Sequence, residues 1–440
     1  WDGHVSGGSI KLDLGNDWQL VDRFNLTKGK ANTFGLVPNG SATTVASVAD
    51  NGESATGAVT GTVYDGDTPI QQIGRWVVLK DIEAFTNDLA VSKSWEDFDT
   101  SFGIYSATTK AEDWWSIGNT AYHVLQPGGE LLDGIECNTD AQGCDWNYDI
   151  SSVGDASTFA VYATGTWYAT TDLSIDLGLR RENHEVSYSV DEGLDGEITK
   201  ALEYDETKTS WTVGANYALN DTSGVFVRMN RGYKMPYFDD FRDNWGAYTG
   251  GNDLIKEVTQ GELGYKFMND SIQFFATAFA NEVKGDTFVR RPGAPAEILT
   301  NEAYGLELDG RYSHDSGFSL SVNATIQETE ITASANNEGN ESQRQPGWQV
   351  RVTPSYGFDI GDMYATVYGT LSAVDDRFGN NENTVVLEGY EKVDVGLTLE
   401  PTESLRLQFS VDNLTDEQGI TEGDPRNPDS PNGRYIMPRS

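Results

Sequence analysis

Apolar and polar residues alternate with a period of two along much of this chain, and this pattern restricts its fold more than any other feature. The alternation is clearest over residues 173–180, 211–219, 318–326 and 405–412. Successive side chains of a β-strand point to opposite faces, so each segment is predicted to be a strand with one apolar and one polar face. The sequence contains no apolar stretch of about 18 residues, which excludes a transmembrane helix. It leaves a membrane β-barrel open, because barrel strands alternate and are never continuously apolar.

Short and long connections also alternate along the chain. The predicted short turns contain Asn, Asp, Gly and Ser, which suit tight hairpins; they lie at 15–17, 95–97, 170–172, 220–224, 269–270, 314–317, 359–362 and 401–404. Long polar segments, predicted to be irregular loops, cover 27–75, 109–156, 182–207, 233–256, 283–298, 328–347, 374–384 and 415–434. Outer-membrane barrels have short periplasmic turns and long extracellular loops, whereas a soluble sandwich has no reason to keep every second connection short.

Composition narrows the possible functions. The formal net charge of −39 over 440 residues argues against a nucleic-acid partner, because phosphate binding needs a basic surface. Between Lys110 and Ala156 the sequence has nine acidic residues and no basic residue except Lys110 itself. This charge indicates either a solvated surface adapted to saline water or attraction of a cationic ligand. Aromatic residues beside the predicted turns favour an interfacial girdle; they are Trp18, Trp167, Tyr168, Trp211, Tyr356, Phe358 and Tyr364.

Three segments contain motifs that go beyond the alternating pattern. The first runs from Val225 to Phe241 and includes Gly-Tyr-Lys-Met-Pro, and the second is the Ala303–Arg311 strand Ala-Tyr-Gly-Leu-Glu-Leu-Asp-Gly-Arg. The third starts at Gly389-Tyr390, contains Val-Asp-Asn-Leu-Thr-Asp-Glu up to Glu417 and finishes with Gly433–Ser440. Together these segments resemble TonB-dependent outer-membrane receptors, and the resemblance implies a 22-stranded barrel filled by an N-terminal plug. It also implies uptake of a scarce nutrient, energised by the inner-membrane TonB complex. Such nutrients include iron chelates (siderophores), cobalamin, haem and oligosaccharides.

The strand count departs from the complete pattern of that family. Eight short turns predict about sixteen strands, which fit positions six to twenty-one of a barrel of about 22. No plug-like region and no TonB box is recognisable, and the sequence stops where the last strand would begin. The predicted fold is therefore all-β, an antiparallel transmembrane β-barrel of the 22-stranded receptor type, covered over about sixteen strands plus the start of another. Residues 1–440 are expected to be its C-terminal part, without the plug, the TonB box, the early strands and the end of the last strand.

Two other functions compete with active uptake. About sixteen strands would also suit a passive porin-like channel, since porins have 16 or 18. A secreted β-rich carbohydrate-active enzyme would need paired carboxylates. Adjacent acidic residues such as Asp239 and Asp240 or Asp375 and Asp376 point to opposite faces of a strand, and no nucleophile elbow, phosphate loop or HExxH motif is present. We therefore expect a bacterial outer-membrane protein that is not an enzyme, with no cofactor, no metal site and no nucleic-acid partner.

The ligand-contacting residues are predicted from the loops. Trp114, Trp115, Tyr122, Trp146 and Tyr148 gather in the longest acidic segment, where flat rings could stack on a sugar or an aromatic iron chelator. Alternatively, these rings pack a small loop core around a disulfide between Cys137 and Cys144, which would close a short loop in an oxidising compartment. Arg290 and Arg291 could meet an anionic ligand or be a solvated loop tip.

The energetics of the bilayer predict which face meets lipid. An Arg on the lipid face near the midplane costs roughly 2–4 kcal/mol, whereas an Arg in the lumen stays hydrated. The apolar residues Leu405, Leu407, Phe409 and Val411 should therefore face outward and Arg406, Gln408 and Ser410 inward. The same rule places Leu173, Ile175, Leu177, Leu179, Phe318, Leu320, Val322 and Ile326 on lipid, and Asp176 and Arg180 in the lumen.

Overall fold

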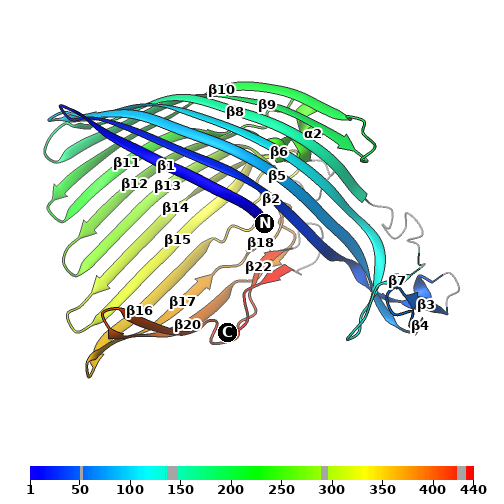
Figure 1. Cartoon of the computed structure of the whole chain (residues 1–440). Helices are drawn as coiled ribbons and strands as arrows, with labels where there is room; N and C mark the ends of the chain where they lie inside the picture. The colour runs from blue at the N-terminus through cyan, green and yellow to red at the C-terminus, as the bar shows by residue number, and fades with distance from the viewer. Residues whose placement is uncertain (50–52, 134, 136–146, 289–295, 424–432) are drawn as a thin grey trace.

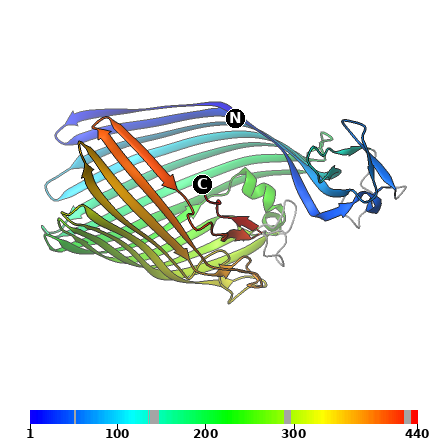
Figure 2. The same cartoon turned by 90° about the horizontal axis from the view of Figure 1, so that it is seen from below.

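A computed structural model describes residues 1–49, 53–133, 135, 147–288, 296–423 and 433–440. One antiparallel sheet of sixteen strands dominates it, and each strand pairs with the next one of the sheet along the chain. The strands are β1 (Asp2–Gly15), β2 (Trp18–Thr44), β5 (Pro69–Ser94), β6 (Phe98–Val124), β8 (Asn147–Tyr168), β9 (Leu173–Glu192), β10 (Lys200–Asn220), β11 (Ser223–Lys234), β12 (Lys256–Met268), β13 (Ile272–Phe288), β14 (Glu297–Ser313), β15 (Phe318–Ala333), β16 (Trp348–Ile360), β17 (Met363–Val374), β20 (Tyr390–Thr402) and β21 (Leu405–Val411). The sheet curls into an incomplete barrel with β1 and β21 as its edges (Figures 1 and 2).

Short elements complete the described residues. They are η1 (Val45–Ser47), β3 (Ser54–Gly57), β4 (Val63–Asp65), β7 (Leu132–Asp133), α1 (Phe238–Asp243), α2 (Trp245–Thr249), β18 (Arg377–Phe378), β19 (Val386–Leu387), β22 (Ile420–Gly423) and β23 (Gly433–Tyr435). Among the described residues, no helix is long and apolar enough to cross a membrane.

All eight predicted short turns join neighbouring strands, and they lie together at one end of the sheet (Figure 1). Side chains close them as their composition predicts. At the β12–β13 turn, Asn269 Oδ1 accepts hydrogen bonds from the backbone N–H groups of Ser271 (3.0 Å) and Ile272 (2.7 Å). At the β1–β2 turn, Asn16 and Asp17 have φ values of 51° and 63°, a conformation that Asn and Asp tolerate better than most residues.

At the opposite end, the prediction of long irregular loops is wrong for several segments. The strands β2, β5 and β6 have 27, 26 and 27 residues, whereas a strand needs only about 9–11 residues to span a bilayer. Much of 27–75, 109–156 and 182–207 therefore continues as paired strands beyond the lipid. In water, backbone pairing persists while both faces accept polar residues, so the period-two signal fades although the strand continues.

The pairing register confirms which residues share a face. One row runs across nine strands through directly paired residues: Trp167, Ile175, Ala215, Val227, Leu263, Ala278, Leu306, Ile326 and Trp348. The neighbouring row on the other face contains Thr166, Asp176, Gly214, Arg228 and Glu262. The side chains of Leu263 and Leu179 are 61% and 56% exposed. Such exposure of large apolar side chains is expected on the outer face of a barrel, where lipid would cover them.

The concave side of the sheet is the one that carries the polar row. On β9, Asp176 and Arg180 lie on the same face as His184, Val186 and Tyr188, because they are separated by even numbers of residues. The latter three are buried against the segment that holds α1 and α2, and both helices lie inside the curl of the sheet (Figure 2). Asp176 and Arg180 thus face the lumen, as predicted.

The pairing register also fixes the orientation of β21, the last strand of the sheet. Phe409 pairs with Leu397, which is linked through Val367 and Tyr356 to Phe318 on the lipid-facing side of β15. Leu405, Leu407 and Val411 share the face of Phe409, while Arg406, Gln408 and Ser410 share the other face. The predicted orientation of β21 is therefore confirmed.

Candidate functional site

Residues 235–255, between β11 and β12, form an insert that lines the inner face of the sheet beyond the lipid. Asp239 and Asp240 lie in the first turn of α1, where negative charge suits the helix dipole. The backbone N–H of Tyr237 donates to Asp240 Oδ2 at 3.0 Å and closes the helix start. The insert buries an apolar core with β8, β9 and β10, made of Ile150, Ala156, Val186, Tyr188, Val190, Leu202, Tyr204, Met235, Phe238, Phe241, Leu254 and Ile255.

Arg242 of α1 is a buried cation within this insert. Its Nη1 lies 2.7 Å from Asp239 Oδ1 and its Nε lies 2.8 Å from Asp243 Oδ1. Burial alone would lower the pKa of Arg242, but these carboxylates offset it and hold the pKa above its ordinary value. On the strands that face the insert, Lys80 Nζ of β5 forms an ion pair with Asp113 Oδ2 of β6 at 3.1 Å. Burial raises the pKa of the Asp113 carboxyl.

Three aromatic rings meet at the same place, each from a different strand. The ring of Trp115 (β6) lies 6.4 Å from those of Trp76 (β5) and Tyr148 (β8), measured between centroids. The Arg242 guanidinium lies 4.2 Å from the Trp115 ring centre, and Lys80 Nζ lies 5.5 Å from it. We call these five residues the vestibule cluster.

The vestibule cluster combines a planar apolar surface with polar groups. Burial raises the pKa of the Tyr148 phenol above its ordinary value, and a protonated phenol can donate a hydrogen bond. The cations Lys80 and Arg242 are outnumbered by Asp113, Asp239 and Asp243. Such a site suits a ligand with flat rings that is not strongly anionic.

The sequence-predicted site residues are only partly brought together. Trp115 and Tyr148 meet, whereas the adjacent Trp114 pairs with Leu79 on the outer face of β6. These residues lie on strands rather than in a loop. Trp146, Arg290, Arg291 and the proposed Cys137–Cys144 disulfide lie outside the described residues.

Tyr122 lies in a separate small core, 4% exposed, with Val45, Ala55, Tyr64, Ile70, Val124 and Leu132. The carboxylate of Glu130 ties the β3–β4 connection to this core by accepting hydrogen bonds from the backbone N–H groups of Val59 (2.6 Å) and Thr60 (2.8 Å). Tyr122 therefore lies apart from the vestibule cluster.

Sequence reasoning missed Trp76, Lys80 and Arg242. A weak signal existed for Arg242, which lies three residues after Asp239 directly behind the Gly-Tyr-Lys-Met-Pro motif, the spacing of an ion pair on one helix face. Trp76 and Lys80 show no comparable signal, because only the β5–β6 register places them beside Trp115 and Asp113.

His184 ties β9 to the start of the insert. Its ring nitrogens lie 2.8 Å from the Thr158 hydroxyl and 3.0 Å from the carbonyl oxygen of Pro236. Because a carbonyl only accepts, Nε2 carries the proton and Nδ1 accepts from Thr158. Burial lowers the pKa of His184 and keeps the ring neutral.

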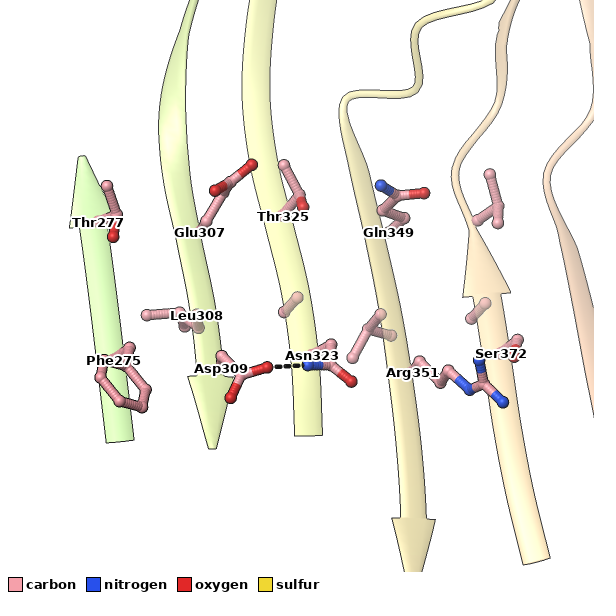
Figure 3. A pocket seen from close by; sticks show the side chains of 14 residues that line it. Phe275, Thr277, Glu307, Leu308, Asp309, Asn323, Thr325, Gln349, Arg351 and Ser372 are labelled. Carbon is pink, nitrogen blue, oxygen red and sulfur yellow. Dashed lines mark hydrogen bonds between the residues drawn. The ribbon is translucent and has the colours of Figure 1, made fainter. Parts of the chain in front are cut away.

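A polar hollow of about 460 Å³ lies on the lumen wall of β13–β17 (Figure 3). Glu307, Asp309, Asn323, Gln349 and Arg351 are among its lining residues, and the Asn323 amide donates to Asp309. No group of three or more His, Cys, Asp or Glu side chains in the described ranges is arranged to hold a metal ion.

Comparison with known proteins identifies the architecture. Residues 2–414 match the family described as TonB dependent receptor-like, beta-barrel. The pesticin receptor of Yersinia pestis is 25% identical over 294 residues, which cover 62% of this chain and 42% of the receptor. The rhizobactin receptor of Rhizobium meliloti is 25% identical over 211 residues, covering 40% of this chain and 28% of that receptor. The chain thus spans about two fifths of the length of the pesticin receptor.

Solved structures share the fold at low identity. The ferric yersiniabactin uptake receptor FyuA from Yersinia pestis has a TM-score of 0.63 and 16% identity, covering 95% of this chain and 67% of that one. The ferric preacinetobactin receptor BauA from Acinetobacter baumannii has a TM-score of 0.66 and 15% identity, covering 99% and 61%. The fold prediction of a receptor-type barrel is therefore confirmed.

Proposed function

This chain belongs to the TonB-dependent receptor β-barrel family of the bacterial outer membrane, and from this premise we propose that its protein imports a siderophore-type iron chelate. The observation that carries the proposal is the family match over residues 2–414, together with two structural neighbours that are named as a ferric yersiniabactin uptake receptor and a ferric preacinetobactin receptor. Membership of a receptor family disfavours the two alternative functions, a secreted carbohydrate-active enzyme and a passive porin-like channel. Iron chelates are favoured over cobalamin, haem and oligosaccharides because the names of these two structural neighbours state a ferric ligand.

The vestibule cluster supports the proposal from the chemical side. Trp76, Trp115 and Tyr148 offer ring surfaces to a bulky chelate on the lumen side of the sheet, beyond the lipid. The excess of carboxylates there, within a chain of net charge −39, disfavours a highly charged anionic chelate through repulsion. We infer a neutral, zwitterionic or cationic chelate as the ligand.

The proposed partners follow from the family. The outer face with Leu179 and Leu263 would contact the outer-membrane lipid. Energy for import would come from the inner-membrane TonB complex, and a plug within the lumen would control passage. These roles concern the whole receptor rather than residues 1–440 alone.

A matched pair of variants tests the proposal in cells that carry the full-length receptor gene. Uptake of radioactive iron is measured under iron limitation from a panel of ferric hydroxamate, phenolate and carboxylate chelates. We expect Trp115→Leu to weaken the apparent affinity for the accepted chelate about three- to tenfold, since an aromatic contact contributes about 0.5–1.5 kcal/mol.

Trp114→Leu is the control, because Trp114 lies on the opposite face of the same strand. It should leave uptake unchanged. Deleting the tonB gene should abolish uptake altogether. Iron uptake that is independent of the receptor, or influx that persists without TonB, would contradict the proposed function.

A further inference from the structure

We propose that three extracellular segments of this chain are latched into one conformational unit, so that releasing one of them loosens the others. The segments are residues 334–347 between β15 and β16, residues 375–389 between β17 and β20, and residues 420–422 of β22. They lie at the end of the sheet opposite the eight short turns (Figure 1), and we call them the rim unit. The latch would act in the same way for any nutrient that the receptor carries.

Asn383 joins the second segment to the first through both ends of its side-chain amide. Its Oδ1 accepts a hydrogen bond from the backbone N–H of Glu341 at 2.8 Å, and its Nδ2 donates to the carbonyl oxygen of Glu341 at 3.0 Å. This two-way contact imitates a hydrogen-bonded residue pair of an antiparallel ladder. Asn383 has a φ of 54°, a backbone conformation that Asn adopts more readily than most residues. Its residue type therefore fits both the turn and the contact.

Two further hydrogen bonds join the same two segments. Asn340 Nδ2 donates to the carbonyl oxygen of Asn381 at 2.8 Å, and the backbone N–H of Arg344 donates to the carbonyl oxygen of Phe378 at 2.7 Å. Asn381 is only 3% exposed, so water competes little at this contact. Bonds that share one interface are energetically coupled, because each forms more readily while the others hold the segments together.

Two arginines extend the latch to the third segment. Arg377 is 6% exposed, and its Nη2 donates to the carbonyl oxygens of Ile420 (2.7 Å) and Thr421 (3.2 Å). Arg344 forms an ion pair with Glu422 through Nη1, in addition to its backbone bond to the second segment. Hydrogen bonds from a guanidinium are stronger than those between neutral groups. Arg344 thus contacts both other segments at once.

The first segment is also tied to the barrel itself. The Ser342 hydroxyl donates to Asn301 Oδ1 at 3.1 Å, and the Ser342 backbone N–H donates to the Thr329 hydroxyl at 3.2 Å. On β15, the backbone N–H of Ile331 donates to the carbonyl oxygen of Asn340 at 2.7 Å. An opened latch would therefore leave this segment attached to β14 and β15, while the mutual restraint of the three segments is lost. The rim unit should open as one cooperative unit.

Hydrogen–deuterium exchange of the purified full-length receptor in detergent tests the latch. Asn383→Gly removes both bonds to Glu341, and glycine adopts a φ of 54° without strain. The decisive group is the Arg344 backbone N–H, because its bond to Phe378 does not involve the Asn383 side chain. We expect exchange at Arg344 to quicken about tenfold, which corresponds to about 1.4 kcal/mol, as measured by mass spectrometry of overlapping peptides.

A reciprocal variant tests the coupling in the other direction. Asn340→Ala removes only the side-chain bond to Asn381. Exchange should then quicken about fivefold at the Thr384 backbone N–H, which donates to Asn380 Oδ1 within the second segment at 3.1 Å. Asn336→Ala is the matched control, because Asn336 is an exposed Asn of the first segment; it should leave exchange at Thr384 unchanged.

Four results would overturn the proposal. The bonds are independent if Asn383→Gly quickens exchange at Glu341 but not at Arg344, or if Asn340→Ala leaves Thr384 as protected as in the wild type. An equal effect of Asn336→Ala would indicate general fragility of the first segment instead of a latch. The Phe241 backbone N–H in α1, which donates to the carbonyl oxygen of Tyr237, should exchange at the wild-type rate in every variant. Faster exchange there would mean that the whole protein had loosened.

Discussion

Replacing Phe241 with alanine should release the insert from the sheet without unfolding the barrel. Phe241 is 0% exposed, and its ring lies 5.2 Å from those of Tyr204 and Tyr248. Truncating a buried Phe to Ala costs about 3–5 kcal/mol. The cost falls on the docking of residues 235–255, because the strands of the barrel keep all their backbone pairs. The fraction of time that the insert spends open should rise by a factor of a hundred or more, since every 1.4 kcal/mol is tenfold.

Trypsin reports this opening through cleavage after Arg242. The Arg242 side chain is 6% exposed while the insert is docked, so cleavage follows the open population when opening and closing are fast. We expect Phe241→Ala to accelerate the appearance of a fragment starting at Asp243 at least a hundredfold, up to the rate of an unfolded peptide. Phe34→Ala, at a Phe that is 71% exposed on β2, should change the rate less than twofold. An unchanged rate in Phe241→Ala would refute the claim that this core holds the insert.

Three further outcomes are expected. Leu407→Arg should reduce the assembled fraction in outer membranes, at a cost of roughly 2–4 kcal/mol for a lipid-facing Arg, and Gln408→Arg should assemble normally; equal assembly would disprove the face assignment. Burial lowers the pKa of His184. The contribution of His184 to docking of the insert is therefore complete above about pH 6.5, the ordinary pKa of a histidine. This contribution is lost as the pH falls through the lowered pKa. Tryptic cleavage of the insert, relative to cleavage of an unstructured peptide at the same pH, should therefore quicken from pH 7.5 to pH 5, and His184→Gln should remove this dependence. Asp113, whose pKa is raised by burial, acts in the opposite sense, so a slowing of the relative rate would mean that Asp113 dominates. Glu130→Gln should speed hydrogen exchange at the Val59 and Thr60 amides, which donate to that carboxylate; unchanged protection would show that other contacts fix this small core.

The sequence predicted most reliably what the bilayer itself imposes. Lipid requires one apolar face over each membrane span, which produces the alternation at 173–180 and 405–411 and makes their orientation predictable. Turn chemistry was equally readable, since Asn269 must satisfy backbone donors within a very short connection. Beyond the lipid neither constraint holds, and the strand extensions of β2, β5 and β6 therefore have the polar composition of loops.

The candidate site was harder to predict because it depends on register and on a distant segment. Trp114 and Trp115 are adjacent in sequence and equally aromatic, yet only Trp115 faces the lumen. Its cationic neighbour Arg242 comes from an insert far along the chain, brought there by burial of Phe238 and Phe241. Composition alone cannot indicate such a meeting.

The long strands and the insert are physically dependent on each other. Strands β8, β9 and β10 continue beyond the lipid with Val186, Tyr188, Val190 and Leu202 on the lumen side, where water would otherwise contact them. The helices of the insert are too short to be stable alone in water, and they gain their stability by covering this apolar face. Once docked, α1 places Arg242 against Trp115 and buries the guanidinium among carboxylates. The apolar contacts therefore shield the inner side of the extended strands from water, and they also position the polar and aromatic groups of the vestibule cluster.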